Sequence, residues 1–144
     1  MKKQGYSNHR KYNPYFHGLL LLFVITTFIL ASINLIQNLD ETANLFSAYI
    51  ILLISVILCF FYYFIRQFAV KLQDRIIRSE ENFRHYLLTG KPIDSSLDIS
   101  QIVALRFAPD LEFPDLCKRA SEEHLSNTEI KKVISRWKGD YHRI

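Results

Sequence analysis

Two runs of 21 residues without a charged side chain, 16–36 and 45–65, constrain this chain more than any other feature. Each run contains 14 Leu, Ile, Phe or Val residues. At about 1.5 Å per residue, a helix of this length matches the hydrocarbon core of a bilayer, which is roughly 30 Å thick. Because backbone amides in lipid must form internal hydrogen bonds, we expect both runs to be transmembrane helices.

A soluble helical hairpin and a cleaved signal peptide are the alternatives to this interpretation. A chain of 144 residues could not easily cover two helices that are apolar on every face. The first run exceeds the usual apolar region of a signal peptide, about 7–15 residues, and no clear small-x-small cleavage site follows it. We therefore expect a retained signal anchor followed by a second span.

The charges that flank the two runs predict their orientation. Four cations and no acid precede the first run, whereas the connection 37–44 has no cation and contains Asp40 and Glu41. The second run is followed by more cations: Arg66, Lys71, Arg75 and Arg78. Positive charge resists translocation, so we expect a protein of the inner cell membrane with both termini in the cytoplasm. The expected layout is a cytoplasmic segment 1–15, spans 16–36 and 45–65 joined by an external loop 37–44, and a cytoplasmic tail 66–144.

Composition argues against several function classes. The tail contains 14 basic and 12 acidic residues, and this near-neutral balance is poor evidence for nucleic-acid binding. Cys59 and Cys117 are expected in different environments, and no Cys-x-x-Cys occurs, so neither a redox nor a zinc site is indicated. The spans contain no Asp, Glu, Lys or Arg, which pumps and coupled transporters usually need, so such a function is not indicated. No catalytic or phosphate-binding motif is present, so we predict no catalytic residue, no cofactor and no metal.

The tail is predicted to begin with a long helix. No Gly or Pro occurs between Asn44 and Thr89, and Gly90 then predicts a helix end. Whether this helix continues the second span is left open by the sequence. An apolar stripe follows 4-3-4 spacing and resumes after a polar gap: Ile65, Ala69, Leu72, Ile76, Phe83 and Leu87. The stripe either packs on the chain's own C-terminal helices, which we favour, or forms a parallel coiled coil between two copies.

Three short helices are expected after the long one. Asp98 and Gln101 form a capping-box-like start for a helix through Phe107, and a second helix runs from Glu112 or Pro114 to His124. Ser126 and Glu129 form a better capping box for a helix to about Lys138. None of these helices is stable alone, so the sequence predicts an all-α protein: a membrane helical hairpin with a small cytoplasmic helical bundle.

Several segments after the two runs resemble a known family. They are QDRIIR at 73–78, LTGK at 88–91, QIVALRFA at 101–108, IKK at 130–132 with Trp137, and DYHR at 140–143. In this order they resemble a bacterial family of small two-span membrane proteins of unknown function. The N-terminal NHR at 8–10 and PYFH at 14–17 are similar to that family's opening. The resemblance covers nearly the whole chain and implies a bacterial origin and the same layout, but no activity. One departure is Phe113-Pro114, where the family tends to carry an acidic helix start.

Two groups of residues are candidates for interaction. The first contains cationic or aromatic side chains expected to be at least partly exposed, and we predict them as contacts for a protein partner: Arg75, Arg78, Arg106, Lys131, Lys132 and Trp137. The second lies near the expected inner membrane interface: His9, His17 and Arg66. Asp110 could form an ion pair with Arg106 across Pro109, which we interpret as a structural link.

The sequence favours a membrane-anchored protein-interaction module without catalytic activity. Its partners would be the lipid bilayer and either another protein or a second copy of the chain. One alternative is a membrane-tethered nucleic-acid regulator, since Lys131, Lys132, Arg136 and Lys138 faintly suggest a recognition helix. Another is an enzyme or lipid-binding protein with an unrecognised interfacial site at the second group of residues.

Overall fold

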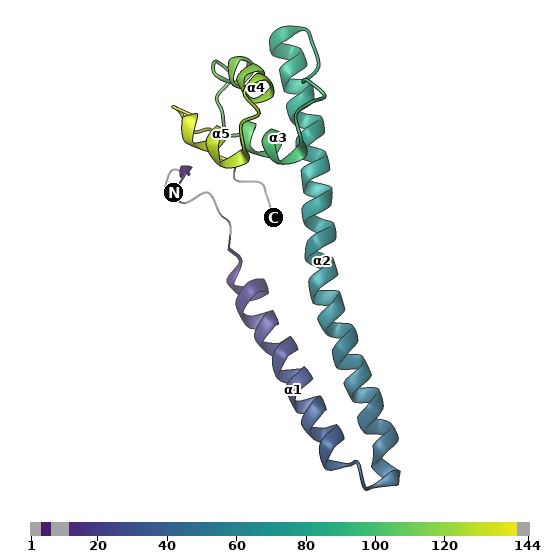
Figure 1. Ribbon diagram of the computed structural model, residues 1–144. Coiled ribbons are helices and arrows are strands. Elements are labelled where there is room, and N and C mark those ends of the chain that lie inside the picture. The colour runs from purple at the N-terminus through teal and green to yellow at the C-terminus, as the bar shows by residue number, and fades with distance from the viewer. Residues whose placement is uncertain (1–3, 7–11, 141–144) are drawn as a thin grey trace. The chain divides into compact units, whose positions relative to one another are not determined.

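The computed structural model describes residues 4–6 and 12–140 (Figure 1). The described residues form an all-α protein without strands. A short π-helix, η2 (Tyr15–Leu20), leads into α1 (Leu21–Gln37), and the long helix α2 (Thr42–Thr89) follows. Three short helices complete the chain: α3 (Ile99–Leu105), α4 (Phe113–Glu122) and α5 (Asn127–Val133). The chain divides into a hairpin unit, Tyr12–Ala69, and a cap unit, which combines Val70–Ile144 with Met1–Lys11.

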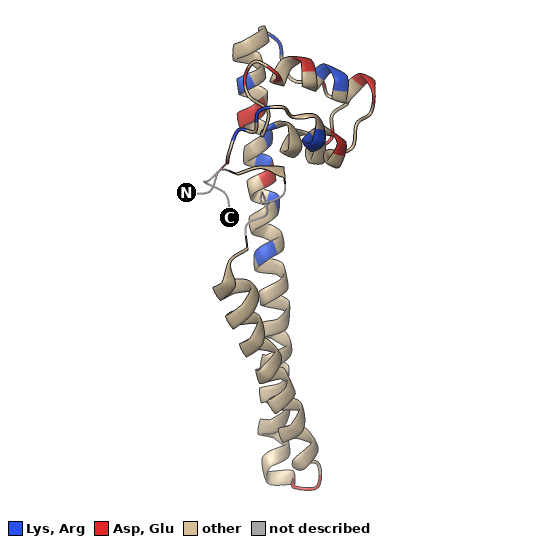
Figure 2. Ribbon diagram, turned by 90° about the vertical axis from the view of Figure 1, so that its left-hand side faces the viewer, with Lys and Arg blue, Asp and Glu red and all other residues tan. Residues whose placement is uncertain are grey.

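The hairpin unit contains two apolar helical stretches that lie side by side (Figure 1). The helices Tyr15–Gln37 and Thr42–Thr89 are both long and apolar enough to cross a membrane. In their most apolar windows only 6% and 11% of the residues are buried, whereas the core helix of a soluble protein is mostly buried. Figure 2 shows no charged residue along α1 or along the first half of α2, and the sequence has none in α2 before Arg66. The connection between the two helices is acidic, with Asp40 and Glu41.

Small side chains lie where the two helices of the hairpin unit meet. Ala31, Ala48 and Ser55 are each 1% exposed, and such residues let helix backbones approach closely. The Ser55 hydroxyl donates to the Leu52 carbonyl at 2.7 Å, so burial leaves this donor satisfied. At the end of α1, the Asn38 side chain donates to the Asn34 carbonyl at 2.8 Å.

Helix α2 answers the question that the sequence left open, since it is continuous from Thr42 to Thr89. It ends at Gly90, whose φ of +72° is a left-handed conformation that a residue with a Cβ adopts only with strain. The Gly90 N–H donates to the Tyr86 carbonyl at 2.8 Å. The sequence prediction of this helix end is confirmed.

The cap unit has its own apolar core, which is supplied mainly by α3, α4 and α5. Its buried residues are Leu97, Ile102, Ala104, Leu105, Ala108, Phe113, Leu116, Cys117, Ala120 and Ile130. Both predicted capping boxes are present: the Gln101 N–H donates to Asp98, and the Glu129 N–H donates to Ser126. These caps satisfy amides that the first turn of a short helix would otherwise leave unpaired.

The last predicted helix is shorter than expected. It ends at Val133 instead of near Lys138, and Ile134 has an extended conformation. The Ser135 N–H donates to a Glu112 carboxylate oxygen at 3.1 Å, and the Lys138 N–H donates to the Phe107 carbonyl at 2.8 Å. These long-range hydrogen bonds replace the last helical turn.

We expected the apolar stripe to pack on the chain's own C-terminal helices, and for the tail half of α2 this expectation is wrong. The side chains of Leu72, Ile76, Phe83 and Leu87 are exposed and are not covered by α3, α4 or α5. The cap instead covers Ile77 and Glu81, which are 5% and 9% exposed. Ile77 lies about 100° around the helix from Ile76, so the buried and exposed faces differ by one residue step.

Candidate interaction site

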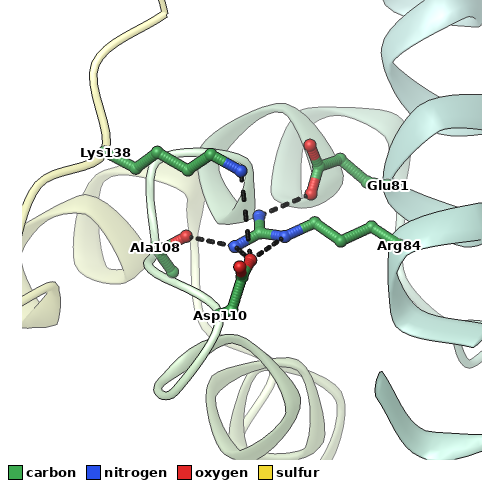
Figure 3. Close-up of polar contacts among 5 residues, drawn as sticks. All are labelled: Glu81, Arg84, Ala108, Asp110 and Lys138. Carbon is green, nitrogen blue, oxygen red and sulfur yellow. Dashed lines mark hydrogen bonds and ion pairs between the residues drawn. The ribbon is translucent and has the colours of Figure 1, made fainter. Parts of the chain in front are cut away.

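Arg84 is the centre of the polar contacts between α2 and the rest of the cap unit (Figure 3). Its guanidinium donates to Asp110 Oδ1 at 2.7 Å, to Glu81 Oε2 at 2.9 Å and to the Ala108 carbonyl at 2.8 Å. The Lys138 ammonium lies 3.9 Å from the same Asp110 oxygen. These contacts join α2 to the turn that precedes α4 and to the segment after α5.

The surroundings of Arg84 strengthen its ion pairs. Its side chain is 12% exposed and that of Glu81 is 11% exposed, so this pair is poorly screened by water. The guanidinium also lies 4.2 Å from the centroid of the buried Phe113 ring, a cation–π contact. The hydrogen bond from Arg84 lowers the pKa of the Asp110 carboxyl. Phe113 is therefore the apolar support of this cluster.

Arg106, a predicted partner contact, is not on the surface. Its side chain is 8% exposed, and it forms an ion pair with Asp140 at 3.2 Å. The predicted link between Arg106 and Asp110 is wrong, because Asp110 pairs with Arg84 and Lys138. Arg106 is therefore part of the cap's internal structure.

Trp137 and Lys131 gather around the buried ring of Phe107. The Trp137 indole stacks on this ring with centroids 4.6 Å apart and an interplanar angle of 20°. The Lys131 ammonium lies 5.9 Å from the centroid of the same ring. Both side chains are half-buried, so they hold α5 and the segment after it against the turn that follows α3. Lys132, by contrast, is exposed.

Arg75 and Arg78 are exposed on α2 and border a hollow of about 310 Å³. The hollow is lined by Arg75, Arg78, Ser79, Asn82, Ile93, Asp94, Ser95 and Ile102. Its carboxylate, Asp94, accepts hydrogen bonds from the Ser96 N–H at 2.9 Å and from the Ser121 hydroxyl at 2.7 Å. These bonds lower the pKa of Asp94, the Ser96 N–H contributing most. Asp94 is thus engaged by its own loop and by α4, and the Arg75 and Arg78 side chains stay exposed.

The second group of candidates belongs to the hairpin unit, except for His9, which lies outside the described residues. His17 lies in η2, and its Nδ1 is 2.9 Å from the Asn13 carbonyl oxygen. Its ring is 5.2 Å from that of Phe16, and the Arg66 guanidinium lies 5.9 Å from the centroid of the Phe16 ring on the other helix. The structure therefore brings His17 and Arg66 to the same aromatic side chain.

Two observations concern groups that could bind a metal ion or act as a nucleophile. Among the residues that the structure describes, no group of three His, Cys, Asp or Glu side chains could hold a metal ion. Burial raises the pKa of the Cys117 thiol to about 12, so this cysteine is a poor nucleophile at neutral pH.

The residues that sequence reasoning missed are Glu81 and Arg84. Their signal was present in the sequence, because two opposite charges three residues apart on a helix lie on one face. Of the six predicted partner contacts, Arg75, Arg78 and Lys132 remain exposed as expected.

Comparison with known proteins gives one match. Neither curated proteins nor solved structures match the chain. The model of a family of unknown function, DUF6526, matches residues 1–144. Because the match extends over the full length, the chain belongs to the family DUF6526.

Proposed function

We propose that this protein is a membrane-anchored interaction module, in which two helices fix the chain in a bilayer and the cap unit docks an acidic protein partner. The observation that carries the proposal is the exposed arginine pair Arg75 and Arg78 beside a polar hollow. Guanidinium groups bind carboxylates through two parallel hydrogen bonds, so acidic side chains of a partner fit this position.

The anchoring step is supported by the exposure of apolar side chains in the hairpin unit. An entirely apolar hollow of about 370 Å³ on α2 is lined by Ile57, Phe60, Phe61, Phe64, Ile65 and Phe68. Many other large apolar side chains of α1 and α2 are exposed as well. A soluble monomer rarely exposes so many together, whereas lipid tails would cover them. The cations on both flanks and the acidic connection favour cytoplasmic termini and an external loop.

The orientation is tested by labelling single cysteines in intact cells with a membrane-impermeant maleimide. A Cys59→Ala chain removes the thiol within α2, and Asp40→Cys or Ser100→Cys then supplies the probe. We expect Asp40→Cys to react from outside the cell and Ser100→Cys to react only after permeabilisation. The opposite pattern would contradict the proposed orientation.

Partner docking is tested by charge reversal on the full chain. Arg78→Glu with Lys132→Glu should reduce the recovery of cross-linked partner after affinity purification, because both side chains are exposed cations. Lys118→Glu with Arg119→Glu is the matched control, since it changes the net charge equally at two other exposed cations, which pair with Glu122 and Glu123 on α4. Equal recovery from both double variants would refute docking through the arginine hollow.

Contacts to anionic lipid at Arg66 are a second candidate function. Arg66 and His17 both lie against Phe16, and a cation at the inner leaflet is attracted to anionic headgroups by about 1 kcal/mol. Arg66→Gln with His17→Ala should lower the amount of anionic lipid that copurifies with the protein. Unchanged lipid would remove this candidate.

The nucleic-acid alternative is weakened because α5 has only 7 residues and Lys131 lies over Phe107.

A further inference from the structure

The tail half of α2 exposes a row of large apolar side chains within the cap unit. This row is the tail half of the apolar stripe, and from here on the name refers to these four residues alone. Their exposed fractions are 61% for Leu72, 50% for Ile76, 63% for Phe83 and 67% for Leu87. The cap's own helices cover a different face of α2, at Ile77. A surface helix normally turns its apolar face inward, so this arrangement leaves a helix face that needs a partner.

The spacing of the stripe fits a coiled coil. Leu72 and Ile76 are four residues apart, and Ile76 and Phe83 are seven apart. In heptad terms Ile76 and Phe83 occupy a positions, and Leu72 and Ser79 occupy d positions. Leu87 lies at the flanking e position, where it widens the apolar surface.

The charges beside the stripe are complementary to those of an identical helix. In the same register Arg75 occupies a g position and Glu80 the e position five residues later, which is the pairing that joins two parallel helices. Both side chains are exposed, and neither forms an ion pair with another described residue. A two-fold axis would form the Arg75–Glu80 contact twice.

We infer that the apolar stripe is the interface between two copies of this chain, which pair as a short parallel coiled coil. The parallel direction rests on the proposed membrane anchoring, which gives every copy the same orientation. Anchoring also confines both copies to one surface, which raises their effective concentration and compensates for a seam with only a few apolar layers. The cap lies on another face of α2, so pairing leaves Ile77 and Glu81 covered as they are.

The test is disulfide cross-linking of the full chain in native membranes. Ile76→Cys is placed at the centre of the interface, and Arg78→Cys is the control, because it is also exposed and lies about 200° further around the same helix. Both are made in a Cys59→Ala chain, and the buried Cys117 stays in place. Under mild oxidation we expect Ile76→Cys to give a dimer of the chain and Arg78→Cys to give almost none.

Charge exchange then tests the register and the identity of the partner. Glu80→Arg in the Ile76→Cys chain should lower the cross-linking yield about tenfold, because two attractive contacts become repulsive. Adding Arg75→Glu should restore the yield, since it recreates both pairs with exchanged signs. Restoration supports a parallel dimer. Equal yields from Ile76→Cys and Arg78→Cys, no restoration, or cross-linking of Ile76→Cys only to another protein would overturn it.

Membrane fractionation of every variant separates this inference from the proposed function. Resistance to alkaline carbonate reports anchoring, whatever the cross-linking yield. A chain that stays in the membrane but gives no dimer refutes the interface and leaves the anchoring intact. A chain that is extracted yet shows the charge-exchange pattern retains the interface and refutes the anchoring.

Discussion

Replacement of Arg84 by Met should destabilise the cap unit more than any exposed ion-pair mutation in the same unit. Met keeps an apolar stem against Phe113 but removes the three hydrogen bonds of the guanidinium. Glu81, whose side chain is 11% exposed, would then be left as a buried charge without its arginine. Loss of one partner from a buried pair is costly because the remaining charge stays desolvated.

The expected cost follows from the exposure of each partner of Arg84. The bond to Asp110 contributes least, at most about 1 kcal/mol, because that carboxylate side chain is 63% exposed and screened by water. The Ala108 carbonyl contributes about 1 kcal/mol, as a typical hydrogen bond does. The orphaned Glu81 charge contributes about 2 kcal/mol after allowance for local relaxation. Since these contributions are not additive, we expect the free energy of unfolding to fall by about 3 kcal/mol.

The assay uses Trp137, which is the only tryptophan of the chain. Its indole stacks on the buried Phe107 ring, so its fluorescence reports the packing of the cap unit and not of the hairpin unit. Full-length protein in detergent micelles is unfolded with urea, and the change in midpoint is converted to a free energy with the measured slope. The control is Arg119→Met, which removes an ion pair whose side chains are 52% and 50% exposed.

Two outcomes would refute the reasoning about Arg84. One is a loss of stability no larger than that of Arg119→Met, which we expect to be small because water screens this exposed pair. The other comes from adding Glu81→Gln to Arg84→Met. If the orphaned charge is the main cost, this second change should recover part of the stability. A further loss would show that the packing of the stem matters more than the charge.

Two more predictions concern the same unit. Cys117 is buried and its thiol pKa is raised to about 12, so maleimide should not label it in a Cys59→Ala chain until urea unfolds the cap unit; labelling of the folded chain would contradict its burial. The pKa values of Asp110 and Glu112 are lowered from 3.8 and 4.5, mainly by hydrogen bonds from Arg84 and Ser135. A carboxyl group whose pKa is lower in the folded state stabilises that state at pH values above its ordinary pKa. This stabilisation is lost as the pH falls through the folded-state pKa. The urea midpoint at Trp137 should thus be nearly constant between about pH 6 and 8 and decrease below about pH 4.5, and Glu112→Gln should reduce the decrease.

Local signals in the sequence were sufficient to predict the elements of this fold. The two uncharged runs, the stop at Gly90 and both capping boxes each depend on residues within a few positions of one another. Such signals fix where a helix begins and ends because its terminal amides and carbonyls are satisfied locally. The same reasoning failed after Val133, where the terminating contacts come from Glu112 and Phe107, more than 20 residues away.

Side-chain exposure was less predictable because it depends on which face of α2 the cap covers. The apolar character of Ile76 and Phe83 suggested that their face would be buried, and the structure buries the face of Ile77 instead. Arg106 shows the same limit, since a cation that was expected at the surface pairs with Asp140 inside the cap. Charge and hydropathy indicate whether a side chain requires an ion-pair partner or an apolar environment. Tertiary packing decides which residues supply it.

The tail half of α2 thus presents three different faces, and this division explains how one short cap could serve both an external partner and a second copy of the chain. Glu81 and Arg84 face the cap and stabilise it. Arg78 borders the polar hollow, where an acidic partner is proposed to dock. Ile76 and Phe83 expose the apolar stripe proposed to pair two copies. Arg75 and Ser79 line the hollow and also belong to the proposed interface, so the two surfaces adjoin, whereas Arg78 belongs to the hollow alone and Glu80 to the interface alone. We therefore expect Arg78→Glu to weaken partner recovery without loss of the Ile76→Cys cross-link, and Glu80→Arg to weaken the cross-link without loss of partner recovery. If one change abolished both, the two surfaces would be a single site, and the assignment of Arg78 and Glu80 to different surfaces would be wrong.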